Sequence, residues 1–172
     1  MTQTVTQPTI ELGAKGDAVK RAQRALRRTS DFSVPPSVVV DGVFGPATQQ
    51  AVKDFQSASP PLAVDGIVGA QTWDALPDGG PMPLLKEGLK ADAVHPLQQA
   101  LADGAAGQWV TSPGQIDGIF GPKTRASVEA LQKWGKVSVD GIVGDRTWTI
   151  TVVRTEHHID LEVVVGLQYI VG

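Results

Sequence analysis

The sequence predicts a mainly α fold in which two small three-helix domains stand in tandem and a β-prone tail follows them. A long motif occurs twice along the 172-residue chain. Apolar residues at helical spacing accompany each copy, which is typical of amphipathic helices. The residues from 150 onward are instead rich in Val, Ile and Thr, which favours a hairpin or strands added to another sheet.

The internal repeat defines the domains. Residues 41–48 recur at 117–124 with the pattern Asp-Gly-x-Phe-Gly-Pro-x-Thr, and residues 65–73 recur at 140–148. Self-similarity at a nearly constant offset, here 76 and 75 residues, indicates a duplicated structural unit, and a join rich in Pro and Gly indicates a linker. We therefore expect an extension at 1–9, a first repeat at 10–77, a linker at 78–82, a second repeat at 83–149 and a tail at 150–172.

Three helices are expected in each repeat, in the same order. The first is indicated by apolar residues at i, i+3 and i+7. The second and the short third helix each follow an Asp-Gly turn, in which Gly permits positive φ. Pro46 and Pro122 stand where the first helical turn favours proline. The residues that mark the helices are Val19, Ala22, Leu26, Val52, Phe55 and Trp73 in the first repeat and Val94, Leu97, Leu101, Val128, Leu131 and Trp148 in the second.

The composition excludes several classes of function. Fifteen basic and eighteen acidic residues give a net charge of −3, so no basic surface for nucleic acid is expected. No run of 18 apolar residues occurs, so we expect no membrane insertion. The chain has no cysteine, which excludes disulfides, thiolate nucleophiles and Cys-ligated zinc.

The residues that the two repeats share form a long and specific pattern. Its segments are Leu12-Gly13, Ala25-Leu26, 40–48, Phe55-Gln56 and 64–73 in the first repeat and Leu85, Leu97-Gln98, 116–124, Leu131-Gln132 and 139–148 in the second. These segments resemble the peptidoglycan-binding domain family of bacterial cell-wall hydrolases, the type 1 three-helix domain. The resemblance implies a module that binds peptidoglycan, by its stem peptide or its glycan, and that is usually attached to an amidase, peptidase, lysozyme or transpeptidase.

Two stretches depart from the family pattern. Residues 30–39 form an extra Pro-containing segment, and residues 103–115 form a longer, Gly-rich one. Both lie between the first helix and the Asp-Gly turn, a region that in such a domain would border the ligand groove. Two alternatives follow, a shifted ligand preference or a loss of binding.

No catalytic, metal or cofactor site is expected. The wall-specific cysteine peptidases and L,D-transpeptidases need a cysteine. The three histidines, His95, His157 and His158, do not form a set of zinc ligands with an open position. The glutamates show no pattern that would place two carboxylates across a glycosidic bond. They are Glu11, Glu87, Glu129, Glu156 and Glu162.

The four Asp-Gly turns are the first candidates for ligand binding. Their carboxylates and the helix N-termini that follow them could bind amides and carboxylates of a stem peptide. The alternative is a structural role, in which the aspartate holds its own turn by local hydrogen bonds. The candidate residues are Asp41, Gly42, Asp65, Gly66, Asp117, Gly118, Asp140 and Gly141.

Tryptophans and a basic stripe are the other candidates. Trp109 and Trp134 have no counterpart in the first repeat and, if exposed, could stack on sugar faces. The aromatic residues that the repeats share are expected in the core. The stripe on the first helix is expected to be a solvated face or a surface that attracts anionic wall polymers. The shared aromatics are Phe44, Phe120, Trp73 and Trp148, and the stripe comprises Lys20, Arg21, Arg24, Arg27 and Arg28.

The tail suggests a protein partner or self-association. Residues 149–153 and 159–171 are expected to be strands, and an exposed apolar edge strand invites pairing with another chain. The expected function is therefore non-catalytic wall binding at the bacterial envelope or outside the cell. The alternative is a structural part of a phage or contractile-injection particle, with the repeats as scaffold and the tail as docking segment. The first nine residues lack the features of a signal peptide, so delivery by a particle or by lysis is expected.

Overall fold

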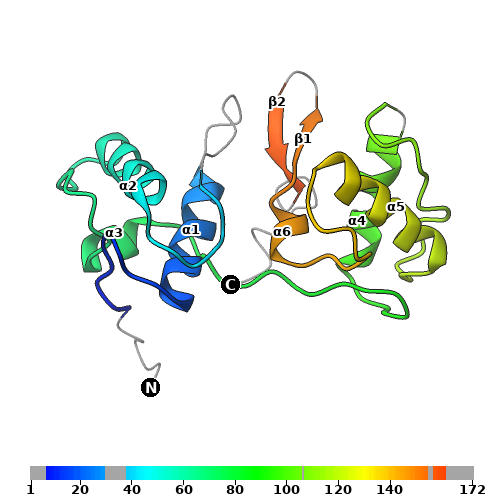
Figure 1. The fold of residues 1–172 in the computed structure, drawn as a ribbon, viewed down its shortest axis with the longest axis horizontal. Coiled ribbons are helices and arrows are strands. Elements are labelled where there is room, and N and C mark those ends of the chain that lie inside the picture. Colours follow the sequence, from blue (N-terminus) through cyan, green and yellow to red (C-terminus); the bar gives the residue numbers. More distant parts are fainter. Residues whose placement is uncertain (1–6, 30–37, 106, 155–156, 162–172) are drawn as a thin grey trace. The chain divides into compact units, whose positions relative to one another are not determined.

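The chain folds into two compact units, Met1–Pro81 and Met82–Gly172, whose boundary falls inside the expected linker. The computed structural model describes residues 7–29, 38–105, 107–154 and 157–161 (Figure 1). Most of the first extra stretch, residues 30–37, lies outside the described residues. Helices dominate both units, which confirms the mainly α fold expected from the repeat.

Unit one contains α1 (Asp17–Thr29), α2 (Pro46–Ala58) and α3 (Ala70–Ala75). The segment before α1 is extended and forms isolated antiparallel bridges, from Ile10 to Val68 and from Lys15 to Val43. These bridges fasten the start of the unit to both Asp-Gly turns. The helices and turns enclose one apolar core, whose buried members include Val19, Leu26, Phe44, Val52, Val68 and Leu76.

Unit two repeats this plan with α4 (Val94–Ala105), α5 (Pro122–Trp134) and α6 (Asp145–Trp148). The bridges recur as well, from Leu85 to Val143 and from Lys90 to Ile119. Phe120 and Trp148 are fully buried, as expected for core residues. The other buried members include Leu97, Leu101, Val128, Leu131 and Val143.

A tryptophan closes each unit onto the start of its own chain segment. The indole Nε1 of Trp73 donates to the carbonyl of Pro8 at 2.9 Å, and that of Trp148 donates to the carbonyl of Pro83 at 2.8 Å. Both rings also pack against the apolar core, Trp148 fully and Trp73 partly buried. An indole suits this place because it combines a large apolar area with a polar N–H.

The helix starts follow from the local sequence. Gly45 and Gly121 precede α2 and α5 in extended conformation, and Pro46 and Pro122 occupy the first helical turn. Proline is favoured there because its missing N–H would have no partner within the helix. Gly42 and Gly118 both have φ of 77°, as the tight turns require.

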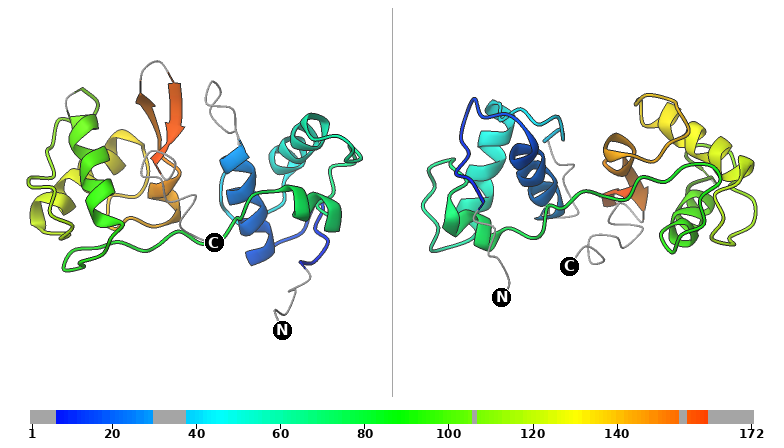
Figure 2. Two further views of the ribbon diagram at one scale, coloured as in Figure 1. Left: turned by 180° about the vertical axis from the view of Figure 1, so that it is seen from behind. Right: turned by 90° about the horizontal axis from the view of Figure 1, so that it is seen from below.

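The tail begins as part of unit two. The strands β1 (Thr151–Arg154) and β2 (His157–Asp160) form an antiparallel hairpin in which Thr151 faces Asp160. Figure 2 shows this hairpin following α6 in two further views. The expected long second strand from residue 159 is wrong in its described part, because β2 ends at Asp160 and Leu161 is helical. Residues 162–171 of that prediction lie outside the described residues.

Two residues of the tail complete the core of unit two. Ile150 is 4% exposed and Leu161 is fully buried. The backbone N–H of Leu161 donates to the carbonyl of Ile150 at 2.9 Å, which brings the two ends of the hairpin together. The core of unit two therefore extends beyond residue 149, the expected end of the second repeat, because it includes Leu161 at the far end of the hairpin.

The basic stripe on α1 holds the end of unit one. Arg21 donates to Oδ1 of Asp78 at 2.6 Å, and Arg28 donates to the carbonyls of Asp78 and Gly80. Arg24 and Arg27 are only 9% and 8% exposed. The expectation of a solvated helix face is therefore wrong for Arg24 and Arg27, which are buried, whereas Arg21 and Arg28 stay partly exposed while they bond residues 78–80 of the expected linker.

None of the helices in the described parts of the chain has the length and apolar character needed to cross a bilayer.

Candidate functional site

Each Asp-Gly turn is locked by a glutamine from the preceding helix. In unit two, Nε2 of Gln98 donates to Oδ1 of Asp117 at 3.1 Å and to the carbonyl of Ile119 at 2.9 Å, and it lies 3.0 Å from Oγ1 of Thr124. Its Oε1 accepts the backbone N–H groups of Asp117 and Gly118. One buried carboxamide therefore satisfies both sides of the turn and ties it to the first turn of α5.

This arrangement, which we call the turn network, occurs four times. The glutamines are 1–2% exposed, and each lies within hydrogen-bond distance of an aspartate, a threonine and the backbone of the turn. Buried polar groups are stable only when hydrogen-bonded, so each turn network is a polar core of its own. The four sets are Gln23, Asp41 and Thr48; Gln56, Asp65 and Thr72; Gln98, Asp117 and Thr124; and Gln132, Asp140 and Thr147.

The turn aspartates are held in the ionised form. The backbone N–H two residues on and the glutamine amide both donate to Oδ1, and these bonds lower the pKa of Asp65, Asp117 and Asp140. The pKa of Asp41 is lowered by the same bonds, the largest contribution coming from Gln23. A carboxylate that accepts several N–H bonds is stabilised in its charged state. Each aspartate therefore holds its own turn through Oδ1, which is the structural role that the local sequence predicted.

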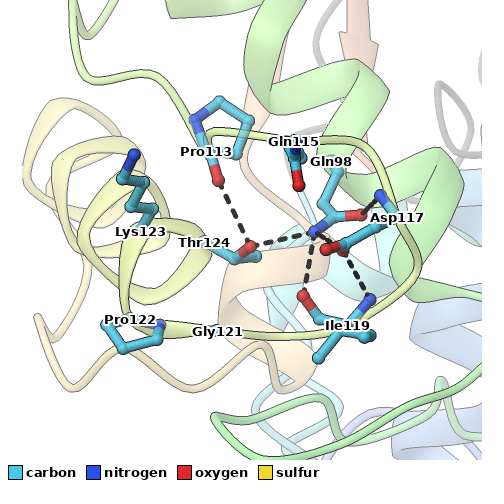
Figure 3. A pocket seen from close by; sticks show the side chains of 9 residues that line it. All are labelled: Gln98, Pro113, Gln115, Asp117, Ile119, Gly121, Pro122, Lys123 and Thr124. Atoms are coloured by element: carbon cyan, nitrogen blue, oxygen red, sulfur yellow. Dashed lines mark hydrogen bonds between the residues drawn. The ribbon is translucent and has the colours of Figure 1, made fainter.

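A groove in unit two lies against one of these networks (Figure 3). Its volume is about 490 Å³. The end of the extra stretch 103–115 forms one wall, and the Asp-Gly turn and the start of α5 form the others. The lining residues are Gln98, Pro113, Gln115, Asp117, Ile119, Gly121, Pro122, Lys123 and Thr124.

The groove has two charged groups and an apolar surface between them. Lys123 projects from α5 and Asp117 lies on the turn, at different sides of the groove in Figure 3. Ile119 is 47% exposed and contributes an apolar side chain. The N-cap of α5, Gly121, provides no side-chain hydrogen bond to the helix, so the first-turn N–H groups favour a nearby anion.

Trp109 does not form an exposed platform. It is 7% exposed, its Nε1 donates to the carbonyl of Leu101 at 3.1 Å, and its ring meets that of Trp134 edge to face with centroids 5.7 Å apart. The ring lies over Gly104, where a Cβ would stand 1.9 Å from it. Trp109 therefore does not meet the condition of exposure on which sugar stacking depended, and Trp134 is partly buried against the same core.

The structure does not gather the predicted residues at one place. Asp117 is the one of them that lines the groove, and the other Asp-Gly pairs stand in their own turn networks. The buried glutamines were not predicted as part of the turns. Their spacing was the available signal, because they precede the aspartates by 18 and 9 residues in unit one and by 19 and 8 in unit two.

Within the described ranges, no group of three or more His, Asp or Glu side chains is placed to hold a metal ion.

Known proteins are similar to part of this chain. A curated protein of Kitasatospora aureofaciens, named "Uncharacterized protein in bpoA1 3'region", is 41% identical over 66 residues, which are 38% of this chain and 52% of that protein. The match thus spans about half the length of this relative. The crystal structure of the SleB N-terminal domain is 36% identical and covers 41% of this chain and 89% of that domain, with a TM-score of 0.35.

The family match covers both units. Residues 15–76 and residues 90–150 each match the family described as "Putative peptidoglycan binding domain". The first range runs from the bridge before α1 to the end of unit one's core, and the second runs from the matching bridge to Ile150. Because these ranges take in more than half of the sequence, the chain belongs to the peptidoglycan-binding domain family, with one copy of the domain in each unit.

Proposed function

We propose that this chain is a non-catalytic protein that attaches itself, or an assembly that carries it, to bacterial peptidoglycan. The observation that supports this most directly is the double family match, which occupies nearly all of the helical part of both units. Binding also fits the groove of unit two, which offers polar and apolar groups side by side. Linked domains that bind the same polymer raise each other's effective concentration, so modest affinity in each unit would be enough.

The place of action under this proposal is the bacterial envelope or the space outside the cell. A particle or cell lysis would bring the chain there. The tail beyond Leu161 would then attach the chain to its carrier or to a second copy. Under this proposal the two units bind the wall, and the last residues attach the chain to its carrier or to a second copy.

Co-sedimentation with insoluble peptidoglycan sacculi tests the proposal. The full chain is compared with a version that ends after Leu161, because an earlier end would remove a fully buried core residue. Circular dichroism confirms that both are folded. Retention of both versions on the sacculi would support wall binding by the units, and absence of both from the pellet would contradict it. Intact peptidoglycan chains after incubation would support the non-catalytic role.

A scaffold role in a phage or contractile-injection particle is the second candidate. The specific observation in its favour is that each Gln carboxamide and each Asp Oδ1 of the Asp-Gly turns already has internal hydrogen-bond partners. Repeats whose turns are held rigid by internal hydrogen bonds would serve as spacers. Folded protein that fails to sediment with sacculi, but is retained by the parent particle through its tail, would favour this role.

A further inference from the structure

The two units differ in some of the residues that line the groove of unit two. When the repeats are superposed by sequence, Lys123 stands at the position of Ala47, and Gln115 at that of Val39. Ala47 and Val39 are both exposed in unit one. The turn networks beside these positions are the same in both units, so the fold does not require the difference.

Lys123 gives the unit-two groove a cationic side. The lysine is exposed on the first turn of α5, where the helix N-terminus also favours negative charge. Asp117, held by Gln98 and by the N–H of Ile119, provides the opposite charge at the turn. A ligand that fits both ends carries an anionic group for the lysine and an N–H donor for the aspartate.

The groove also lacks the surface that sugars prefer. Its lining contains no aromatic residue, and Trp109, which the sequence had suggested for sugar stacking, is buried in the core. The exposed side chains of Ile119 and Pro122 provide aliphatic surface instead. Such surface suits small aliphatic side chains, whereas flat sugar faces pair best with aromatic rings.

We infer that the groove of unit two binds the peptide part of the wall polymer, with a free carboxylate of that peptide at Lys123. Unit one lacks this preference for a ligand carboxylate. The inference rests on the proposed function and names the ligand class for one of its two units. Repulsion between Asp117 and the ligand carboxylate sets one orientation, with the carboxylate at α5 and the peptide N–H groups at the turn.

Titration calorimetry with soluble wall fragments tests the inference on the full chain. The probes are a disaccharide-peptide released from sacculi by a muramidase, the same fragment with its carboxylates amidated, and a chitin-type oligosaccharide without peptide. The variant Lys123→Ala is compared with Lys133→Ala, which removes an exposed lysine from the last turn of the same helix. The reverse variant, Ala47→Lys, introduces the cation into unit one.

The expected result is binding of the free disaccharide-peptide that Lys123→Ala weakens about three- to fivefold at low salt, the size of an exposed ion pair. The loss should shrink as salt rises, because exposed charges are screened. Lys133→Ala should bind like the wild type, the amidated fragment should not respond to Lys123→Ala, and Ala47→Lys should strengthen binding of the free fragment.

Two results would overturn the inference while leaving the proposed function intact. One is equal binding of the oligosaccharide and the disaccharide-peptide. The other is unchanged affinity of Lys123→Ala for the free fragment while the protein is still retained on sacculi. Loss of sacculus binding by the folded wild-type chain is a different outcome, because it contradicts the proposed function itself.

Discussion

The side-chain amide nitrogen of Gln56 lies 2.8 Å from Oδ1 of Asp65, and the amide oxygen accepts the backbone N–H of Gly66 at 2.9 Å. The same carboxamide reaches Thr72 at the start of α3. Gln56 belongs to α2, so the turn is held by a residue of the helix that precedes it. Each unit is therefore tied together by polar contacts at two turns as well as by its apolar core.

Replacing Gln56 by alanine is expected to lower the free energy of unfolding of unit one by about 2–4 kcal/mol, because the buried turn groups lose their partners and a cavity opens. Gln50→Ala is the matched control, since Gln50 is exposed on the same helix and bonds only Asp54 among the described residues. Urea denaturation followed by circular dichroism measures both. Equal stability of the two variants would show that the turn network contributes little.

The turn aspartates predict a loss of stability in acid. The pKa of Asp65 is lowered by the N–H of Ile67 and by Gln56, so its folded-state pKa lies below the unfolded value of about 3.9. Its contribution is fully present above the unfolded pKa and disappears as the pH falls through the folded-state pKa. The wild-type midpoint of thermal unfolding should therefore be nearly constant above about pH 5 and fall below about pH 4.

Asp65→Asn should reduce this acid dependence. The asparagine keeps an oxygen acceptor in the turn and loses the titrating charge, so the variant is slightly less stable at neutral pH and declines less steeply in acid. Asp74→Asn is the control, because Asp74 is exposed on α3 outside the turn network. A decline as steep in Asp65→Asn as in the wild type would contradict the assignment.

The fold could be predicted from the sequence because it depends on local signals that occur twice. Helical spacing, Asp-Gly turns and first-turn prolines each identify an element without knowledge of its partners. The core positions of Phe44, Phe120 and Trp148 could be predicted in the same way, since each residue lies beside such a signal. All three are fully buried.

The site could be predicted less well, because its contacts join residues far apart in the chain. The burial of Trp109 depends on Gly104, whose missing Cβ makes room for the ring, and composition alone suggested an exposed polar stretch. The arginines of α1 are covered because residues some 50 positions later return to that helix. The end of the unit-two core at Leu161 likewise requires the hairpin to return, which no local pattern indicates.

Gly104→Ala is expected to destabilise unit two despite the better helix propensity of alanine. Alanine gains about 1 kcal/mol in a helix interior, but its Cβ would lie 1.9 Å and 2.0 Å from two ring carbons of Trp109. Relieving that overlap requires the buried ring to move, at a cost of about 1–3 kcal/mol or more. Gly107→Ala, where a Cβ meets nothing within 4 Å, is the control. Thermal unfolding and the near-ultraviolet dichroism of Trp109 and Trp134 report the change.

Arg28→Ala is expected to loosen residues 78–80 without unfolding unit one. The arginine bonds the carbonyls of Asp78 and Gly80, and loss of these partly exposed bonds should cost about 1 kcal/mol. The positions 75 residues after Arg21, Arg24 and Arg28 hold Pro, Gln and Asp, so unit two lacks these arginines. Limited proteolysis should cut the 78–82 segment about fivefold faster, and Lys133→Ala should leave the rate unchanged. An unchanged rate in Arg28→Ala would mean that other contacts hold the segment.

Leu161→Ala tests whether the tail belongs to the fold of unit two. Leu161 is fully buried and its N–H bonds the carbonyl of Ile150, so truncating its side chain should lower the stability of unit two by about 2–4 kcal/mol. Ending the chain after Leu161 should cost much less, since the apolar core keeps all of its described members. Hydrogen exchange measured on peptides reports on each unit separately. Only peptides of unit two should exchange faster in Leu161→Ala. If Leu161→Ala leaves exchange as in the wild type, the hairpin and Leu161 are an appendage and the core of unit two ends with Trp148 and Ile150.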